Sequence, residues 1–445
     1  MVARVIEWWD DLRSSWWFVP LTMSFGAVVL SFVTTTLDAR FAEVFEDFGL
    51  NAGGAQGTRS LLETVASSMI TVAGVSFSIA IVVMTLASSQ FGPRVLRTFM
   101  RDVGNQVTLG TFLATFLFSV LGLRTVRGQN GGDEFVPHLS VTVAVLLTLA
   151  SLAVFIYFIH HSARSIQASQ IIAAAGRDLD KATENLFPGQ IGSDAEAGSQ
   201  VDTPAERAGV VSSEGSGYVE MVDGRTLLAV AKGADLLVEL EVSPGSYVIE
   251  GVALAHVWPA ERMDEKLTKR IRGAVTLGDG DQRREQQDMG YALDQLAQIC
   301  LRALSPAFND PLTANMCIDR LAAGMAKLAR AELPNRTRVD DEGRARVLAP
   351  TPALPDMLET AFGEIRRSAR SNVAASLRLL YAFGVIGSAA TRPEDVSALR
   401  AVCRMVVEDA SVDLSGDDLA RLREAQLEVL AMLDAAERTP APVGS

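Results

Sequence analysis

Hydrophobic and polar residues are segregated along this chain, and four uncharged apolar stretches lie within the first 165 residues. These stretches run over about residues 14–37, 64–90, 103–123 and 137–159. Each is long enough, at about 1.5 Å per residue, to cross a hydrocarbon core about 30 Å thick as an α-helix. The pattern predicts a four-helix transmembrane domain over residues 14–165, preceded by a short interfacial helix over residues 1–13.

The second stretch has two different faces. Its hydroxyl residues follow one 4–3 spacing and therefore share one side of a helix: Thr64, Ser68, Thr71, Ser78, Thr85 and Ser89. Alanines recur every seven residues on roughly the opposite side. The hydroxyls admit two interpretations, either hydrogen bonds between packed membrane helices or the lining of a water-filled path formed by copies of this helix. Both interpretations place this helix at the centre of the membrane domain.

A basic segment follows the second stretch and contains Gln90, Arg94, Arg97 and Arg101. The three arginines are spaced i, i+3, i+7, so they share one side if the segment is helical. They serve either as an orientation signal that contacts lipid phosphates or as a positive ring at the cytoplasmic mouth of a path. Basic residues number seven on the side of the termini and four on the other. This bias places both termini in the cytoplasm, under the inner membrane.

The remainder of the chain is polar and predicts a cytoplasmic α+β region. Residues 166–207 suggest a polar helix and an acidic linker, and residues 208–260 consist of short alternating runs punctuated by glycine. We predict that four of these runs are strands of a small, all-β, barrel-like module: VEMV, TLLAVA, LLVELEV and SYVIEGVALAHV. Residues 281–437 predict a helical bundle with a short hairpin at 336–348, and residues 438–445 a disordered tail.

The sequence SPAFNDP separates two of the predicted helices of this bundle. Asp310 is placed to cap the helix that begins at Pro311, and Asn309 precedes it. A corner fixed by helix capping accounts for these residues. The alternative is that their exposed side chains dock a neighbouring subunit or the underside of the membrane domain.

Composition narrows the range of functions. The net charge of −13 comes largely from the polar region, and no basic surface for nucleic acid is present. The three cysteines are widely spaced in apolar helical contexts, which is typical of buried free thiols. No phosphate-binding loop, nucleophile elbow or metal-binding spacing occurs. We therefore expect no catalytic residues, no cofactor and no metal, and a protein that is not an enzyme.

Two long motifs resemble a known family. They are ASSQFGPRVLRTFMRDVGNQVTLGTFLATFLFSVLGLRTVR and EQQDMGYALDQLAQICLRALSPAFNDPLTANMCIDRL, and the segment SGYVEMVD…PGSYVIEGVALAHV is similar to the middle of the same family. That family is a bacterial "predicted membrane protein" family defined only by a domain of unknown function. The resemblance covers roughly residues 10–435. It implies a four-span inner-membrane protein with a cytoplasmic β-plus-helical region, and it implies no established activity.

These observations favour a homo-oligomeric ion channel or small-solute permeation protein with the second membrane helix at the path. The cytoplasmic region would assemble and gate it. The alternative is a non-conducting scaffold or sensor whose cytoplasmic domain binds a partner protein. The expected partners are the lipid bilayer and further copies of the chain.

Overall fold

The structure is a computed structural model, and it falls into two compact units, Met1–Ile171 and Ile172–Ser445. It describes residues 16–47, 54–93, 99–100, 102–127, 135–185, 193–194, 207–278, 289–331, 333, 335–351 and 353–438. The predicted interfacial helix at 1–13, nearly all of the predicted tail and most of the acidic linker lie outside these residues.

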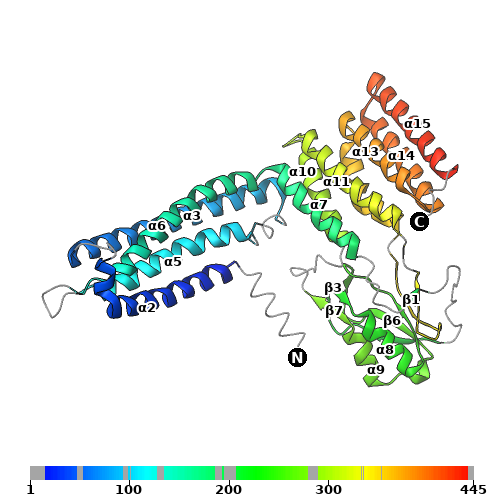
Figure 1. Cartoon of the computed structure of the whole chain (residues 1–445). Coiled ribbons are helices and arrows are strands. Elements are labelled where there is room, and N and C mark those ends of the chain that lie inside the picture. The colour runs from blue at the N-terminus through cyan, green and yellow to red at the C-terminus, as the bar shows by residue number, and fades with distance from the viewer. Residues whose placement is uncertain are drawn as a thin grey trace. The chain divides into compact units, whose positions relative to one another are not determined.

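The first unit contains four long apolar helices (Figure 1). They are α2 (Phe18–Asp47), α3 (Ala55–Phe91), α5 (Val103–Thr125) and α6 (His138–Ser165). Each is long and apolar enough to span a membrane, which confirms the prediction of four apolar spanning helices. In α2 the apolar part ends at Phe41, where the backbone leaves helical geometry.

Helix α5 is the centre of this bundle because it packs against α2, α3 and α6. Its Phe112 and Phe118 are fully buried, and Phe112 meets the ring of Phe155 on α6 edge-on at 6.2 Å. The side chains of α3 that complete this core include Leu62 and Met69.

One buried carboxylate joins α2 to α6. Asp38 is only 1% exposed, and its two oxygens accept hydrogen bonds from the backbone N–H groups of Leu139 and Ser140, at 2.8 and 3.0 Å. The Ser140 hydroxyl donates a further bond to Asp38 at 2.7 Å. The first N–H groups of a helix lack partners within the helix, so Asp38 caps α6 from a neighbouring helix.

The second unit contains two sheets. The six-stranded sheet has the order β1-β8-β9-β4-β6-β2 and the three-stranded sheet the order β5-β3-β7. The strands are β1 (Ser193–Asp194), β2 (Gly209–Ser212), β3 (Gly217–Val222), β4 (Leu237–Leu240), β5 (Tyr247–Val248), β6 (Ala253–Trp258), β7 (Val275–Gly278), β8 (Thr337–Val339) and β9 (Ala345–Leu348). The sheets do not close on themselves, so the prediction of a barrel-like module was wrong.

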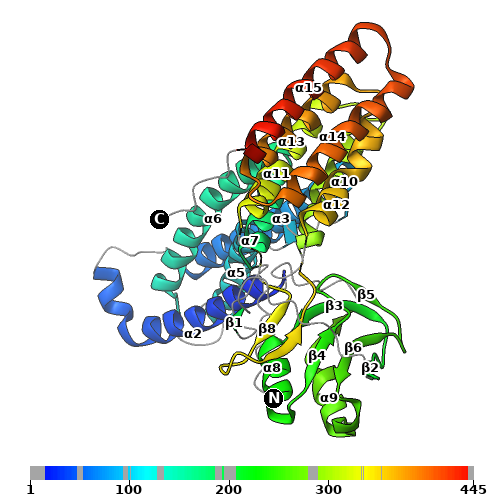
Figure 2. The ribbon, with the colours of Figure 1, turned by 90° about the vertical axis from the view of Figure 1, so that its right-hand side faces the viewer.

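The module is not all-β either. The run TLLAVA, predicted as a strand, lies in helix α8 (Gly224–Ala234), which Asp223 caps by accepting from the N–H of Thr226 at 3.1 Å. Leu227, Val230 and Ala231 are buried at helical i, i+3, i+4 spacing. Together with α9 (Glu265–Gly273), which follows the short 3-10 helix Ala260–Arg262, α8 packs on the six-stranded sheet (Figure 2). An apolar run this short fits the periodicity of a strand as well as that of a helix. The capping aspartate before it is the sequence signal that favours a helix.

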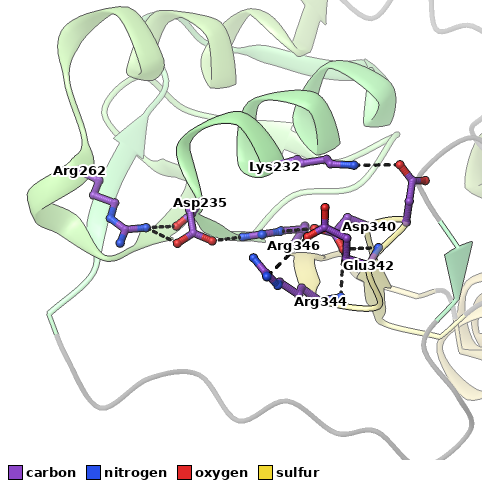
Figure 3. A network of polar contacts seen from close by, with 8 residues as sticks. Lys232, Asp235, Arg262, Asp340, Glu342, Arg344 and Arg346 are labelled. Carbon is purple, nitrogen blue, oxygen red and sulfur yellow. Dashed lines mark hydrogen bonds and ion pairs between the residues drawn. The ribbon is translucent and has the colours of Figure 1, made fainter.

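The hairpin β8–β9 extends this sheet, although it lies about 100 residues further along the chain. Strand β9 pairs in parallel with β4, and a set of ion pairs holds the hairpin turn against the end of α8 (Figure 3). The buried guanidinium of Arg346 donates to Asp340 at 2.7 Å and to Asp235 at 2.8 Å, and Lys232 on α8 pairs with Asp341 at 2.9 Å. The hydrogen bond from Arg346 lowers the pKa of Asp340 to about 2.

We predict that Arg346→Leu lowers the melting temperature of the full chain by about 5 °C at neutral pH, because it leaves the buried Asp340 carboxylate without its cation. The stabilisation from Asp340 is present above its ordinary pKa of 3.8 and is lost as the pH falls toward 2. The difference between variant and parent should therefore shrink in acid. Arg344→Leu is the control, because Arg344 is 64% exposed and its removal should change the melting temperature by about 1 °C or less. Equal effects of the two substitutions would contradict this role for Arg346.

The other elements that the structure describes in the second unit are helices. Its helices are α7 (Ala168–Asn185), α10 (Met289–Leu304), α11 (Pro311–Arg330), α12 (Leu354–Ala369), α13 (Val373–Ala389), α14 (Pro393–Asp413) and α15 (Gly416–Arg438). Cys300, Cys317 and Cys403 are free and buried in their core, where burial raises the pKa of the Cys317 thiol to about 12.

Candidate functional site: the exposed face of α3

The hydroxyl residues predicted to share one side of the second membrane helix do so in the structure. All six are exposed: Thr64, Ser68, Thr71, Ser78, Thr85 and Ser89. We call this set the hydroxyl face. The alanines of the opposite side are 7%, 3%, 4% and 3% exposed and pack inside the bundle: Ala66, Ala73, Ala80 and Ala87. The hydroxyl face therefore points away from the other three helices of its own bundle.

Five of the six hydroxyls on this face donate to a carbonyl of their own helix, and Ser68 is the one for which no such bond is seen. Thr71 donates to the carbonyl of Ser67 at 2.7 Å, Ser78 to that of Gly74 at 2.9 Å, and Thr85 to that of Ile81 at 2.8 Å. Such bonds satisfy the hydroxyl proton without a neighbouring helix. The hydroxyl oxygen can still accept another hydrogen bond.

A shallow groove of about 470 Å³ lies at the middle of the hydroxyl face. It is lined by Thr71, Gly74, Val75, Ser78, Ile79, Val82 and Val83. A Cβ atom added to Gly74 would meet nothing within 4 Å. The bundle itself therefore does not require a glycine at position 74. Small residues in membrane helices allow a second helix to approach the backbone closely.

The other predicted site residues are not brought to this groove. Gln90 is exposed at the end of α3, while Arg94, Arg97 and Arg101 lie outside the described residues. In the second unit, Asp310 caps α11 by accepting from the N–H of Thr313 at 3.1 Å, and its hydrogen bonds to Thr313 lower its pKa. Asn309 adopts a positive φ of 44° at the corner before it.

Comparison with known proteins agrees with this architecture. A family described as "Predicted membrane protein (DUF2254)" matches residues 13–384. The chain belongs to the DUF2254 family. It is 31% identical over 374 residues to the uncharacterised protein Rv1290c of Mycobacterium tuberculosis and equally to the uncharacterised protein Mb1321c of Mycobacterium bovis. Each alignment covers 81% of this chain and 70% of the relative. No solved structure matches the chain.

Membership of DUF2254 and the four apolar helices together identify a multi-pass membrane protein in contact with lipid. These relatives are uncharacterised proteins, so their names indicate no activity for this DUF2254 protein.

Sequence reasoning missed a second polar feature of this DUF2254 protein, which lies inside the bundle. Between α5 and α6, the hydroxyls of Thr115 and Ser151 are 3.0 Å apart, and both residues are buried. Serines on α6 recur every eleven residues, at Ser140, Ser151 and Ser162, and all three are buried. Eleven residues make almost exactly three helical turns, so this spacing was the available signal.

A histidine–aspartate pair lies at one end of this interior seam. Asp102 caps α5 by accepting from the N–H of Asn105, and Nε2 of His161 on α6 lies 2.9 Å from the Asp102 carboxylate. The ring of Tyr157 stacks on His161 with centroids 5.2 Å apart. Gly104 is required here, because a Cβ at this position would lie 2.9–3.1 Å from the polar atoms of these three side chains. The pair fixes the start of α5 against α6, as Asp38 fixes the start of α6 against α2.

Proposed function

We propose that this protein is a homo-oligomeric ion channel or small-solute permeation protein of the inner membrane, and not an enzyme, with both termini in the cytoplasm. Copies of α3 would line the path with their hydroxyl faces, and the cytoplasmic unit would assemble and gate it. The observation that carries the proposal is the orientation of the hydroxyl face, which is exposed while the alanine side of the same helix is buried.

Several features of α3 support this arrangement. A helix that faced only lipid would gain nothing from a hydroxyl at every one or two turns, because each CH₂ or methyl in its place is favourable in hydrocarbon. The groove at Gly74 and Ser78 leaves open space beside the hydroxyls that would face the path. The exposed hydroxyl oxygens offer polar lining atoms once copies assemble around an axis.

The first experiment is the oligomeric state of the purified full chain, by size-exclusion chromatography with light scattering, followed by cryo-electron microscopy. The proposal expects a ring with Thr71, Ser78 and Thr85 directed to a central axis. A monomer, or a dimer in which this face is sealed between two helices, would overturn it and identify the hydroxyls as packing contacts.

A second candidate is a non-conducting scaffold or sensor that binds a partner protein in the cytoplasm. One observation favours it: Tyr247, Ile249 and Val252 are 58%, 60% and 48% exposed on one short segment of the sheet module. Exposed apolar clusters commonly mark interaction sites. Affinity purification of the full chain should then recover one specific protein. Ile249→Asp should abolish its recovery, whereas substitutions on the hydroxyl face should leave its recovery unchanged.

A further inference from the structure

Two side chains inside the bundle of the first unit are buried without a hydrogen-bond partner. Asn105 on α5 is 4% exposed, and among the described residues neither the oxygen nor the nitrogen of its side-chain amide has a partner. The same holds for the hydroxyl of Ser162 on α6, a residue that is 3% exposed. An amide or hydroxyl that leaves water without gaining a new partner is strongly disfavoured. These groups therefore point to a bound polar molecule.

Asn105 and Ser162 both adjoin the Asp102–His161 pair. The backbone N–H of Asn105 donates to the Asp102 carboxylate at 3.1 Å, and Ser162 directly follows His161 on α6. The side chains of the pair are each 27% exposed, so solvent reaches the pair from outside the bundle. The pair therefore marks the point at which water can approach the two unpaired groups.

A third unpaired group lies deeper in the bundle, on α3. The hydroxyl of Ser76, a residue that is 3% exposed, also has no partner among the described residues. Ser76 shares the buried side of α3 with Ala73 and Ala80. Ala73 belongs to a core cluster with Phe112 of α5, and Ala80 belongs to one with Phe158 of α6. Ser76 therefore faces the interior where α3, α5 and α6 meet.

Asn105 and Ser162 face the same interior. Asn105 lies one turn before Leu109, which packs in the cluster that joins α5 to α3. Ser162 lies one turn after Phe158, which packs in the cluster that joins α6 to α3. We call Ser76, Asn105 and Ser162 the unpaired set. Its members come from three helices and share one side of the bundle core.

An aromatic contact separates the unpaired set from hydroxyls that are paired. Phe112 meets Phe155 edge-on at 6.2 Å. One turn beyond this contact on both helices, the hydroxyls of Thr115 and Ser151 lie 3.0 Å apart and bond to each other. The unpaired set lies on the other side, toward the Asp102–His161 end. The protein thus supplies the partners beyond the aromatic contact and leaves them to another molecule before it.

We propose that water enters the first unit beside the Asp102–His161 pair and occupies an internal site formed by the unpaired set, which Phe112 and Phe155 close at its inner end. The ligand is water, because the amide and hydroxyl groups offer it both donors and acceptors. Each copy of the chain then carries an aqueous inlet that ends inside the bundle. The site lies on the buried side of α3, opposite the hydroxyl face, so it is independent of the proposed path and of the oligomeric state.

The test measures the reactivity of cysteines introduced into the full chain in lipid nanodiscs, as Ser162→Cys and, separately, Ser76→Cys. The reagent is the small water-soluble cation aminoethyl methanethiosulfonate, and the intact mass reports its addition. A thiol reacts as its thiolate, which apolar burial suppresses. The three native cysteines are buried. The matched control is Ala66→Cys, because Ala66 is 7% exposed on the same helix as Ser76 but lies about 15 Å further from the Asp102–His161 end.

We expect Ser162→Cys and Ser76→Cys to react at least about ten times faster than Ala66→Cys. Adding Asn105→Leu should slow the reaction of Ser162→Cys about tenfold, because an apolar side chain of similar volume displaces the water. Cryo-electron microscopy of the parent should show water within about 3 Å of the Asn105 amide. Either of two results would overturn the proposal. One is a reaction of Ser162→Cys as slow as that of Ala66→Cys, and the other is a map in which protein groups bond both atoms of the Asn105 amide.

Discussion

Replacing the hydroxyls of α3 by apolar groups of similar size, as Thr71→Val, Ser78→Ala and Thr85→Val together, is expected to lower the flux through reconstituted protein about tenfold or more. The loss of three lining oxygens per copy raises the barrier for a hydrated ion or solute, and about 1.4 kcal/mol corresponds to a tenfold change in rate. The helix itself should remain intact, because each hydroxyl bonds only to its own helix backbone. The measurement is ion or solute release from liposomes that contain the purified variant.

The control makes the same chemical change on another helix. Thr142 and Thr148 of α6 also bond to carbonyls of their own helix, at 2.9 and 2.7 Å, and are not part of the hydroxyl face. Thr142→Val with Thr148→Val should therefore leave the flux within about twofold of the parent. If the α3 variant conducts as well as this control, or if the parent protein conducts nothing, the permeation proposal fails.

The faces of α3 could be predicted from sequence because the information is local. Hydroxyls at 4–3 spacing and alanines at every seventh residue fix two sides of one helix whatever surrounds it. The structure decides which side packs inward, and it buries Ala73 and Ala80. That choice depends on residues of α5 and α6 that no periodicity within α3 reveals.

The sheets were harder to predict because their partners are distant in sequence. Strand β4 pairs with β9, which begins more than 100 residues later, and the turn of the β8–β9 hairpin is fixed by Arg346 reaching Asp235. A hairpin at 336–348 was predicted from its own pattern, but nothing in that pattern showed which sheet it would join. The barrel-like module was predicted incorrectly for the same reason, because the local pattern does not show which distant strands pair.

Asp38 shows this limit most clearly. A charge at position 38 ends the first apolar stretch and is followed by further acidic residues, so nothing in the local sequence marks it as buried. The structure buries it instead, because its partners Leu139 and Ser140 lie about 100 residues away at the start of α6. A carboxylate inside a membrane bundle is tolerated only where donors surround it.

Asp38→Ala is expected to destabilise the membrane unit by about 2–4 kcal/mol. The substitution removes three charge-assisted hydrogen bonds and leaves the first N–H groups of α6 without partners in an environment that holds little water. Asp38→Asn should cost about half as much, because one carbonyl oxygen remains to accept. Thermal unfolding of the detergent-solubilised full chain, followed by tryptophan fluorescence in a Trp258→Phe background, measures the difference, because the remaining tryptophans lie at or before the start of α2 in the sequence.

Glu63 provides the matched control, since it is an exposed carboxylate on another helix of the bundle, α3. Glu63→Ala removes the same charge without removing a cap, so a change of about 0.5 kcal/mol or less is expected. If Glu63→Ala and Asp38→Ala destabilise the protein equally, the effect of Asp38 is one of net charge rather than of capping. If only Asp38→Ala destabilises it, the attachment of α2 to the start of α6 rests on this carboxylate.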